Sequence, residues 1–222
     1  MGNKYYRIMN TTKAHTQYYL KSGDQAPGVT TVLGVLSKPF LVKWANNLGL
    51  KGIDSSKFTN KMASIGTITH LMVMCHLSGT SPDLSEYSQQ DISIAENCML
   101  SFLEWEKEHK LEPVILEIPL VSDIYGYGGT PDFIGLVNGR LELLDFKTSN
   151  AIWDSNFYQL AAYRQIAIEH GHKVERARIL RIGRDSNEGF EERLMTKFDN
   201  EFNLFRNCLS IYNLLKLMGR RL

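Results

Sequence analysis

The chain has 222 residues, 43% of them hydrophobic and 22% charged, which is enough apolar sequence for one globular domain with a sizeable core. Its 25 basic and 24 acidic residues give a formal charge of +1, so there is no global signal for nucleic acid, and any such surface must be a local patch. No apolar run approaches the roughly 18 residues of a membrane span, and the N-terminus lacks a signal-peptide core, so we expect a cytoplasmic protein with no membrane partner.

The three cysteines, Cys75, Cys98 and Cys208, are far apart in the sequence and form no Cys-x-x-Cys pair. This spacing favours reduced, buried thiols, as in a cytosolic protein. An iron–sulfur cluster held by cysteines needs four of them, so no iron–sulfur cluster is expected.

Two short tyrosine-rich runs, 4–9 and 16–20, are separated by polar residues and predict a small hairpin. Their rings could stack on nucleic-acid bases, although cross-strand packing is the commoner role of tyrosine in strands. The residues concerned are Tyr5, Tyr6, Tyr18 and Tyr19.

Helical patterns fill the rest of the first half of the chain. Thr30 or Thr31 is predicted to cap a helix that runs to about residue 37. Pro39 follows and breaks this helix. Apolar residues at helical spacing predict three further helices, at 40–50, 57–77 and 90–109. Gly66 lies inside the second of these, and a mid-helix glycine costs roughly 1 kcal/mol relative to Ala, which indicates a close backbone approach.

From Pro113 onwards the apolar period changes from helical to strand-like. Strands are predicted at 114–121, 125–137 and 140–148, followed by a helix at 153–170. Two more strands are predicted at 174–182 and 189–195, and a last helix, capped by Asp199, at 199–218. This order predicts an α/β fold of the mixed α+β kind, with one central sheet flanked by helices.

The strongest local signal is Asn138-Gly139 between two apolar runs. Both residues of a two-residue hairpin turn must accept positive φ, and Asn-Gly does so most readily. Counting outwards from such a turn pairs Val137 with Arg140. Each further step pairs the next residue of one strand with the next residue of the other.

The same register places Asp132 opposite Asp145, and Lys147, two residues further, on that same face. Two opposed carboxylates repel each other, so something must compensate for their charge. A divalent cation is the natural partner, because Mg²⁺ takes carboxylate oxygens together with waters and phosphate oxygens. The simpler alternative is a hairpin with a structural Asp–Lys pair.

These residues resemble a known nuclease signature. Pro131-Asp132 with Asp145-Phe146-Lys147 resembles the PD-(D/E)XK superfamily, and more narrowly its RecB-type members. The RecB-type nucleases add a Gly-x-x-x-His, a Gly-x-x-Asp and a Gln-x-x-x-Tyr, and this chain has Gly66…His70, Gly129…Asp132 and Gln159…Tyr163 in that order. The stretch 28–33 with Trp44 is also similar to the mitochondrial genome-maintenance exonuclease and its small phage or bacterial relatives.

The resemblance implies a restriction-endonuclease-like core within a single nuclease domain over 1–222. The N-terminal hairpin and helical cap would span 1–110, the nuclease core 111–198 and the C-terminal helix 199–222. It further implies a metal-dependent DNA exonuclease that prefers single-stranded DNA or free ends and acts in DNA repair, recombination or replication. Its location would be the cytoplasm of a bacterium or of a phage-infected host.

The resemblance also assigns roles to single residues. A lone helical histidine is more often structural than a ligand, but the matching histidine in the family completes a site for Mg²⁺ or Mn²⁺. Lys147 would activate the water, and Gln159 and Tyr163 would position the DNA strand. The implied metal ligands are His70, Asp132, Asp145 and the backbone carbonyl of Phe146.

Three further residues have two readings each. Glu117 is the only acid in its apolar run, and it could bind the metal through water or form a salt bridge within the strand. Arg176 and Arg178 share a strand face, which fits a DNA-phosphate patch or a charged strand edge equally well. Asp123 and Glu142 look like solvent or edge positions.

Two other functions remain open at this stage. One keeps the chemistry and changes the substrate, giving a structure-specific endonuclease or junction resolvase. The other is a non-catalytic DNA-binding protein on a nuclease fold. A helicase or a single-strand-binding protein is a plausible partner, and the sequence leaves the oligomeric state, the cleavage polarity and the preferred metal open.

Overall fold

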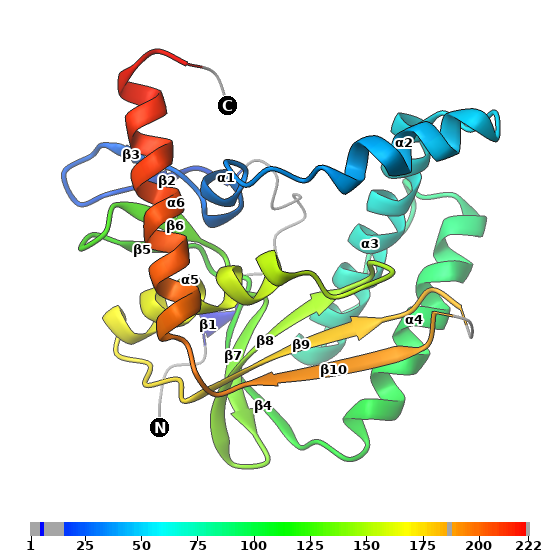
Figure 1. The fold of residues 1–222 in the computed structure, drawn as a ribbon. Helices are drawn as coiled ribbons and strands as arrows, with labels where there is room; N and C mark the ends of the chain where they lie inside the picture. The colour runs from blue at the N-terminus through cyan, green and yellow to red at the C-terminus, as the bar shows by residue number, and fades with distance from the viewer. Residues whose placement is uncertain (1–4, 7–15, 186–187, 221–222) are drawn as a thin grey trace.

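The computed structural model describes residues 5–6, 16–185 and 188–220. A six-stranded mixed sheet lies at the centre, with helices on both of its faces (Figure 1). The predicted mixed α/β fold around one central sheet is therefore confirmed. No helix of the described residues is long and apolar enough to cross a membrane.

The strands of the central sheet follow the spatial order β1-β4-β7-β8-β9-β10. The β1–β4 and β8–β9 pairs are parallel, and the other three pairs are antiparallel. The bounds are β1 Tyr5–Tyr6, β4 Leu111–Leu116, β7 Phe133–Val137, β8 Arg140–Lys147, β9 Arg176–Ile182 and β10 Phe190–Met195. Two small antiparallel sheets accompany it, β2 (Tyr18–Tyr19) with β3 (Gln25–Ala26) and β5 (Leu120–Ser122) with β6 (Tyr127–Gly129).

The β7–β8 hairpin has the predicted turn and register. Asn138 and Gly139 have φ of 50° and 79°, as a two-residue turn of this type requires. Val137 pairs with Arg140, and the ladder continues outwards to Phe133 and Leu144. Turn chemistry alone was therefore sufficient to fix the pairing of these two strands.

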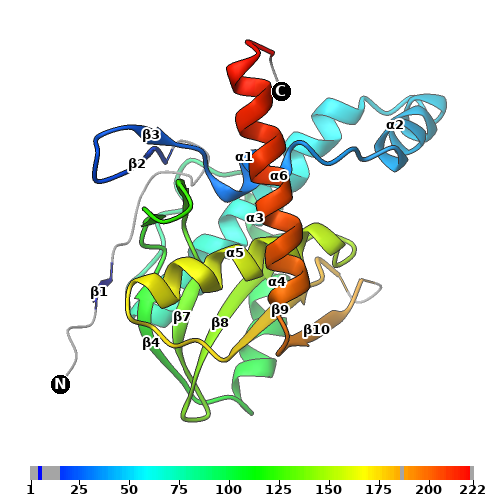
Figure 2. The same cartoon turned by 60° about the vertical axis from the view of Figure 1, so that its left-hand side comes forward.

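The two faces of the sheet carry separate helical layers (Figures 1 and 2). Leu144 and Phe146 of β8 belong to the core beneath α3 (Ser55–Ser78) and α4 (Gln89–Glu106). Leu143 belongs to the core beneath the other layer, because side chains alternate along a strand. That layer consists of α1 (Val29–Leu33), α5 (Asp154–Glu169) and α6 (Asp199–Leu217).

Among the helices of the described residues, only α2 (Phe40–Leu50) stands apart from these layers, and it has no buried residue. In both views it projects sideways from the top of α3 (Figures 1 and 2). The expected N-terminal helical cap is thus in large part a layer of the core, since α3 and α4 bury the sheet. The three cysteines are free and buried, as expected.

The predicted N-terminal hairpin is wrong. Tyr18–Tyr19 pairs with Gln25–Ala26 across a short turn, and Tyr5–Tyr6 instead adds a parallel strand to the edge of the central sheet at β4. The nearer strand wins because a short loop costs less closure entropy than a longer one. The remaining residues of the run 4–9 lie outside the described part of the chain.

Two predicted strands are each broken into two. The run 114–121 divides at Glu117, whose φ of 49° is incompatible with a continuous strand. The run 125–137 divides between β6 and β7, and the residues between them include Asp132. Both breaks therefore fall beside acidic residues of the predicted site.

Helix positions agree with the prediction better than helix caps do. The helix at 40–50 has the predicted bounds, and the others begin or end within a few residues of theirs. The predicted caps are wrong, because α1 begins after Gly28 and α6 after Phe198, neither with a side-chain cap. Asp199 lies in the first turn of α6, where a carboxylate still favours the helix dipole.

We expect the loss of the α3 cap to destabilise the protein. The Asp54 carboxylate accepts hydrogen bonds from the backbone N–H groups of Ser56 and Lys57, at 2.8 and 3.0 Å. Asp54→Ala should lower the free energy of unfolding by about 1 kcal/mol, measured by urea denaturation. Asp54→Asn keeps a side-chain acceptor and is the matched control; an equal loss in both variants would contradict a capping role.

Candidate active site

Asp145 and Lys147 lie at the carboxyl end of β8, on its α5-facing side. Lys147 Nζ is 2.5 Å from Asp145 Oδ2, and the Asp145 side chain is fully buried. The Lys147 side chain is partly exposed. The prediction that these two residues share one face of the hairpin is confirmed, because side chains two positions apart on a strand point the same way.

Asp132 lies just before β7, one position beyond the paired ladder. The register continues towards Asp145, but the last true pair is Phe133 with Leu144. Asp132 is joined to β8 through its side chain instead, since Oδ2 accepts a hydrogen bond from the Phe146 N–H at 2.8 Å. The predicted pairing of Asp132 with Asp145 is therefore wrong, because the two acids occupy adjacent strand ends without being backbone partners.

His70 joins Asp132 to a third acid. Its Nε2 is 3.2 Å from Asp132 Oδ1, and its Nδ1 is 3.0 Å from Glu117 Oε1. A neutral imidazole has a single N–H, so with both carboxylates ionised both contacts can be hydrogen bonds only when the ring carries two N–H groups. The structure thus brings the α3 histidine to the acids of the sheet, as the sequence resemblance implied.

Glu117 follows the end of β4 and is not a mid-strand residue, contrary to the prediction. Its φ of 49° is unfavourable for a residue with a Cβ, by roughly 1–2 kcal/mol. Its backbone N–H donates to the Asp132 carbonyl at 3.2 Å, which holds the kink in place. The kinked backbone leaves the carboxylate in contact with His70.

The close approach of α3 to this strand end depends on Gly66. A Cβ at Gly66 would lie 2.8 Å from Thr148 Oγ1, just beyond the end of β8. His70 is one helical turn further along α3 and so lies on the same side of the helix. The predicted close backbone approach is not what the structure shows, because the group that approaches Gly66 is the Thr148 side-chain hydroxyl.

The donor set suits a hard divalent cation, since it combines carboxylate oxygens with one imidazole nitrogen. Among the described residues, no group of three His, Cys, Asp or Glu side chains is arranged as a ready metal site. Both ring nitrogens of His70 face carboxylates. Because a metal-binding nitrogen must carry no proton, His70 could bind a metal only after exchanging one of these contacts.

Gln159 and Tyr163 lie one turn apart on α5, and Gln159 Nε2 donates to the Tyr163 hydroxyl at 2.9 Å. Burial raises the pKa of Tyr163, and the nearby charge of Asp145 raises it further. The Tyr163 phenol therefore stays protonated at neutral pH beside the buried acid. Its ring fills the space where Gly129 has no side chain, since a Cβ there would be 2.4 Å from Tyr163 Cε1.

Tyr18 and Thr130 also belong to this region, which was not expected from the sequence. The Tyr18 hydroxyl is 2.9 Å from Thr130 Oγ1, in a hydrogen bond that either can donate. A Cβ at Gly128 would be 2.1 Å from Tyr18 Cγ, so β2 lies directly against β6. The Gly128-Gly129 pair was the signal available, since two adjacent glycines admit two aromatic rings.

Arg181 is a second cation on this face, and it was not expected there from the sequence. It is the parallel-strand partner of Lys147, and partners in register point to the same face. Its side chain is nine-tenths buried, with Nε 3.1 Å from Glu191 Oε2. Within the described residues its Nη1 has no hydrogen-bond partner. Only the β8–β9 pairing, which is long-range, reveals this placement.

Arg178 lies on the opposite face from Asp145. It is the register partner of Leu144, which belongs to the α3/α4 core. Its guanidinium binds Glu142, with Nε 2.5 Å from Oε2, and also Glu192. Glu142 is therefore buried and paired, so its predicted solvent or edge position is wrong.

Arg176 pairs in register with Glu142 and so shares the Arg178 face. Neither arginine is on the same side of the sheet as Asp145 and Lys147. A DNA phosphate could reach Arg178 only by displacing two carboxylates, one of them buried, which would leave an unpaired charge in the core.

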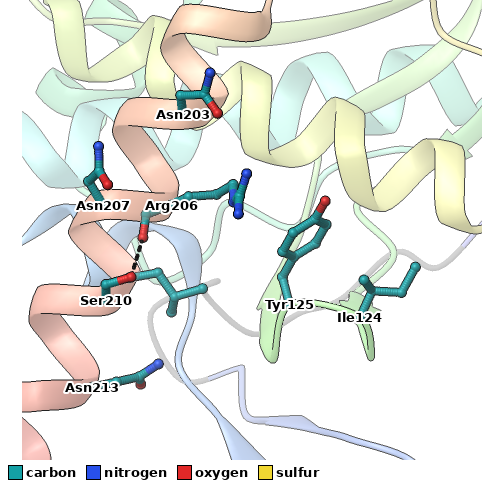
Figure 3. A pocket seen from close by; sticks show the side chains of 8 residues that line it. Ile124, Tyr125, Asn203, Arg206, Asn207, Ser210 and Asn213 are labelled. Atoms are coloured by element: carbon teal, nitrogen blue, oxygen red, sulfur yellow. Dashed lines mark hydrogen bonds between the residues drawn. The ribbon is translucent and has the colours of Figure 1, made fainter.

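A separate hollow of about 440 Å³ lies between α6 and the β5–β6 turn (Figure 3). Arg206 lies over the ring of Tyr125 there, with Cζ 5.5 Å from the ring centroid. None of the predicted site residues lines this hollow. It is therefore distinct from the acidic site.

No protein-family model matches the sequence, and no curated protein matches it. Among solved structures, the chain is similar to a protein from Eubacterium rectale whose name assigns it provisionally as an exonuclease. The identity is 13% and the TM-score 0.46, over 69% of this chain and 66% of that one, just under two thirds of its length.

The chain is also similar to LHK-Exo, an alkaline exonuclease from Laribacter hongkongensis, at 12% identity and a TM-score of 0.40. That comparison covers 72% of this chain and 86% of LHK-Exo. A complex of LHK-Exo with dAMP matches at 15% identity and a TM-score of 0.39. These values are low, and the proposed function is therefore based on the geometry of the site.

Gly129→Ala should destabilise the protein by about 1–3 kcal/mol, because the added Cβ overlaps the Tyr163 ring. The measurement is urea denaturation. Gly49→Ala is the matched control, since Gly49 is helical with open space around it, and it should stabilise by about 0.5–1 kcal/mol. In a Tyr163→Ala background Gly129→Ala should cost less; an equal cost would rule out the ring as the obstacle.

Stability should fall steeply above about pH 10, the ordinary pKa of tyrosine. Burial raises the pKa of both Tyr127, which donates to the Ala162 carbonyl at 2.9 Å, and Tyr163. Below pH 10 both states keep the protons. Above it the unfolded chain loses protons that the folded chain retains, so unfolding becomes easier by about 1.4 kcal/mol per pH unit for each tyrosine.

Urea denaturation between pH 8 and 11 measures this slope. Tyr127→Phe and Tyr163→Phe should each reduce this pH dependence of the free energy of unfolding by the contribution of one proton. Tyr19→Phe, at an exposed position, should not change it. An unchanged slope in both core variants would contradict the prediction.

Proposed function

We propose that this chain is a metal-dependent DNA exonuclease of the PD-(D/E)XK type. The observation that carries the proposal is the meeting of Asp132, Asp145 and Lys147 at one end of β7 and β8. Buried carboxylates beside a cation form an arrangement that phosphodiester hydrolysis can use, because charge develops on phosphate oxygens in the transition state. The ordered position of His70 against Asp132 adds to this support.

The proposed ligands of Mg²⁺ or Mn²⁺ are His70, Asp132, Asp145 and the Phe146 carbonyl, with Glu117 binding through water. When bound, such a metal would stabilise phosphate charge and lower the pKa of a bound water. In the chain itself, Asp132 is already oriented by its hydrogen bond from the Phe146 N–H, and His70 is oriented by its contacts with two acids.

Lys147 is the proposed water-activating residue. Its ammonium group is held against the buried Asp145 carboxylate, while its side chain retains access to solvent. An ammonium group so placed can orient a water with one N–H and neutralise a phosphate oxygen with another.

Tyr163 is proposed as a positioning residue. It is buried and stays protonated, so it can support the acids by hydrogen bonding and packing but cannot act as a base. Gln159 is partly exposed and bonded to Tyr163. Gln159 is thus the better candidate of the two for contact with a DNA strand.

The proposed substrate is single-stranded DNA or DNA with free ends, in repair, recombination or replication, with a helicase or a single-strand-binding protein as a candidate partner. Neither Arg176 nor Arg178 is assigned to the DNA path, because both lie on the face of the sheet opposite to Asp145 and Lys147.

The full chain with Mg²⁺ or Mn²⁺ should degrade linear single-stranded DNA labelled at either end, and EDTA should abolish the degradation. Lys147→Ala and Asp145→Asn should each reduce the rate at least about 100-fold, because each removes charge at the proposed reaction centre. Lys173→Ala removes an exposed lysine elsewhere and should leave the rate unchanged. Thermal denaturation would verify that each variant is folded.

Two outcomes would overturn parts of this proposal. Equal degradation by the wild type and Lys147→Ala would remove the catalytic assignment. Cleavage of closed circular single-stranded DNA would replace the exonuclease with an endonuclease, since a circle offers no end.

A further inference from the structure

The helix α2 exposes apolar side chains that the fold leaves uncovered. It has no buried residue, and several of its large side chains face solvent. Those that are more than one third exposed are Phe40, Leu41, Val42, Trp44 and Leu50. A cluster of exposed apolar residues on one protruding helix indicates a binding surface, whereas single exposed residues are common.

Two aromatic contacts hold α2 against α3 and against the residue that precedes α5. Phe40 stacks on Trp153, with ring centroids 4.8 Å apart and planes inclined by 10°. Trp44, one helical turn later, meets Phe58 of α3 edge-on at 6.1 Å. Trp153 precedes α5. The helix therefore connects to both elements that supply site residues outside the sheet, α3 with His70 and α5 with Gln159.

The Phe40–Trp153 stack is itself accessible to a ligand. Phe40 is 46% exposed and Trp153 is 41% exposed, although each ring covers part of the other. A partly exposed stacked pair is suited to extend its stack onto another flat ring.

On the α2 side of this stack the charged residues are lysines, whereas the exposed Asp154 follows Trp153 on the other side. The sequence from 25 to 53 contains no Asp or Glu, but it contains Lys38, Lys43 and Lys51. Lysines also begin α3, at Lys57 and Lys61. In a chain whose total charge is only +1, an acid-free segment with exposed lysines is a local cationic patch.

We propose that Phe40 and Trp153, with Lys38 and Lys43 beside them, form a stacking platform for the bases of single-stranded DNA. Aromatic rings with neighbouring cations match unpaired bases on a phosphate backbone, whereas the bases of a duplex hide their faces in the stack. The choice of DNA as the ligand rests on the proposed nuclease function. The platform would hold unpaired bases at the residue that precedes α5, which gives a physical reason for a single-strand preference.

Binding of a fluorescent oligothymidylate to the full chain in EDTA tests the platform without catalysis. Phe40→Ala and Trp153→Ala should each weaken binding about 10-fold, because each removes a stacking partner. Phe40→Tyr and Trp153→Phe keep an aromatic ring and should bind close to wild type. Phe190→Ala is the matched control, since Phe190 is a similarly exposed ring on β10.

A blunt duplex of the same length separates stacking from charge. Its binding should be unchanged by Phe40→Ala and Trp153→Ala, whereas Lys43→Ala should weaken binding of both DNA forms and flatten their salt dependence. Equal loss of duplex binding in the aromatic variants would overturn the stacking assignment. Unchanged oligothymidylate binding in those variants, or a dimer that Phe40→Ala dissociates, would also overturn it.

The two proposals fail separately. If DNA is bound through Phe40 and Trp153 but never cleaved with Mg²⁺ or Mn²⁺, the platform stands and the nuclease assignment falls. If DNA is cleaved at the wild-type rate and bound equally well by both alanine variants, the nuclease stands and the platform falls.

Discussion

The Asp132 carboxylate is the interaction on which the site depends. It is buried, and it accepts the Phe146 N–H with one oxygen while the other faces His70. A buried carboxylate without such partners would be too costly to keep charged. By satisfying this one group, the fold fixes β7 to β8 and brings α3 to the end of the sheet, and three separate segments become one site.

Three glycines leave room for other groups around the site. Gly129 admits the Tyr163 ring, Gly128 admits Tyr18, and Gly66 allows α3 to pass Thr148. The backbone of Glu117 is also strained at this site. Its kink ends β4 at the point where the carboxylate contacts His70. Strain retained at a cluster of acids is consistent with a functional role, since surrounding contacts must hold it in place.

The cations on the two faces of the sheet have different surroundings. On the α5 face, Lys147 contacts the buried Asp145, and Arg181 is its register partner on β9. On the α4 face, Arg178 is neutralised by Glu142 and Glu192, which stabilise the core. The proposed cations are therefore Lys147 at the reaction centre and Lys38 and Lys43 at α2, where the exposed rings of Phe40 and Trp153 add a surface for unpaired bases.

The sequence by itself determined what depends on neighbours along the chain. The Asn138-Gly139 turn set the hairpin register, strand alternation placed Lys147 with Asp145, and apolar periodicity located α2 with its bounds. Family resemblance added His70, Gln159 and Tyr163, which the structure places around the same strand end. Tertiary structure alone decided which strand pairs with Tyr18–Tyr19, the left-handed backbone of Glu117 and the face on which Arg178 lies. Those features depend on pairing and packing between distant segments, and local turn chemistry and periodicity carry no information about which distant partner is chosen.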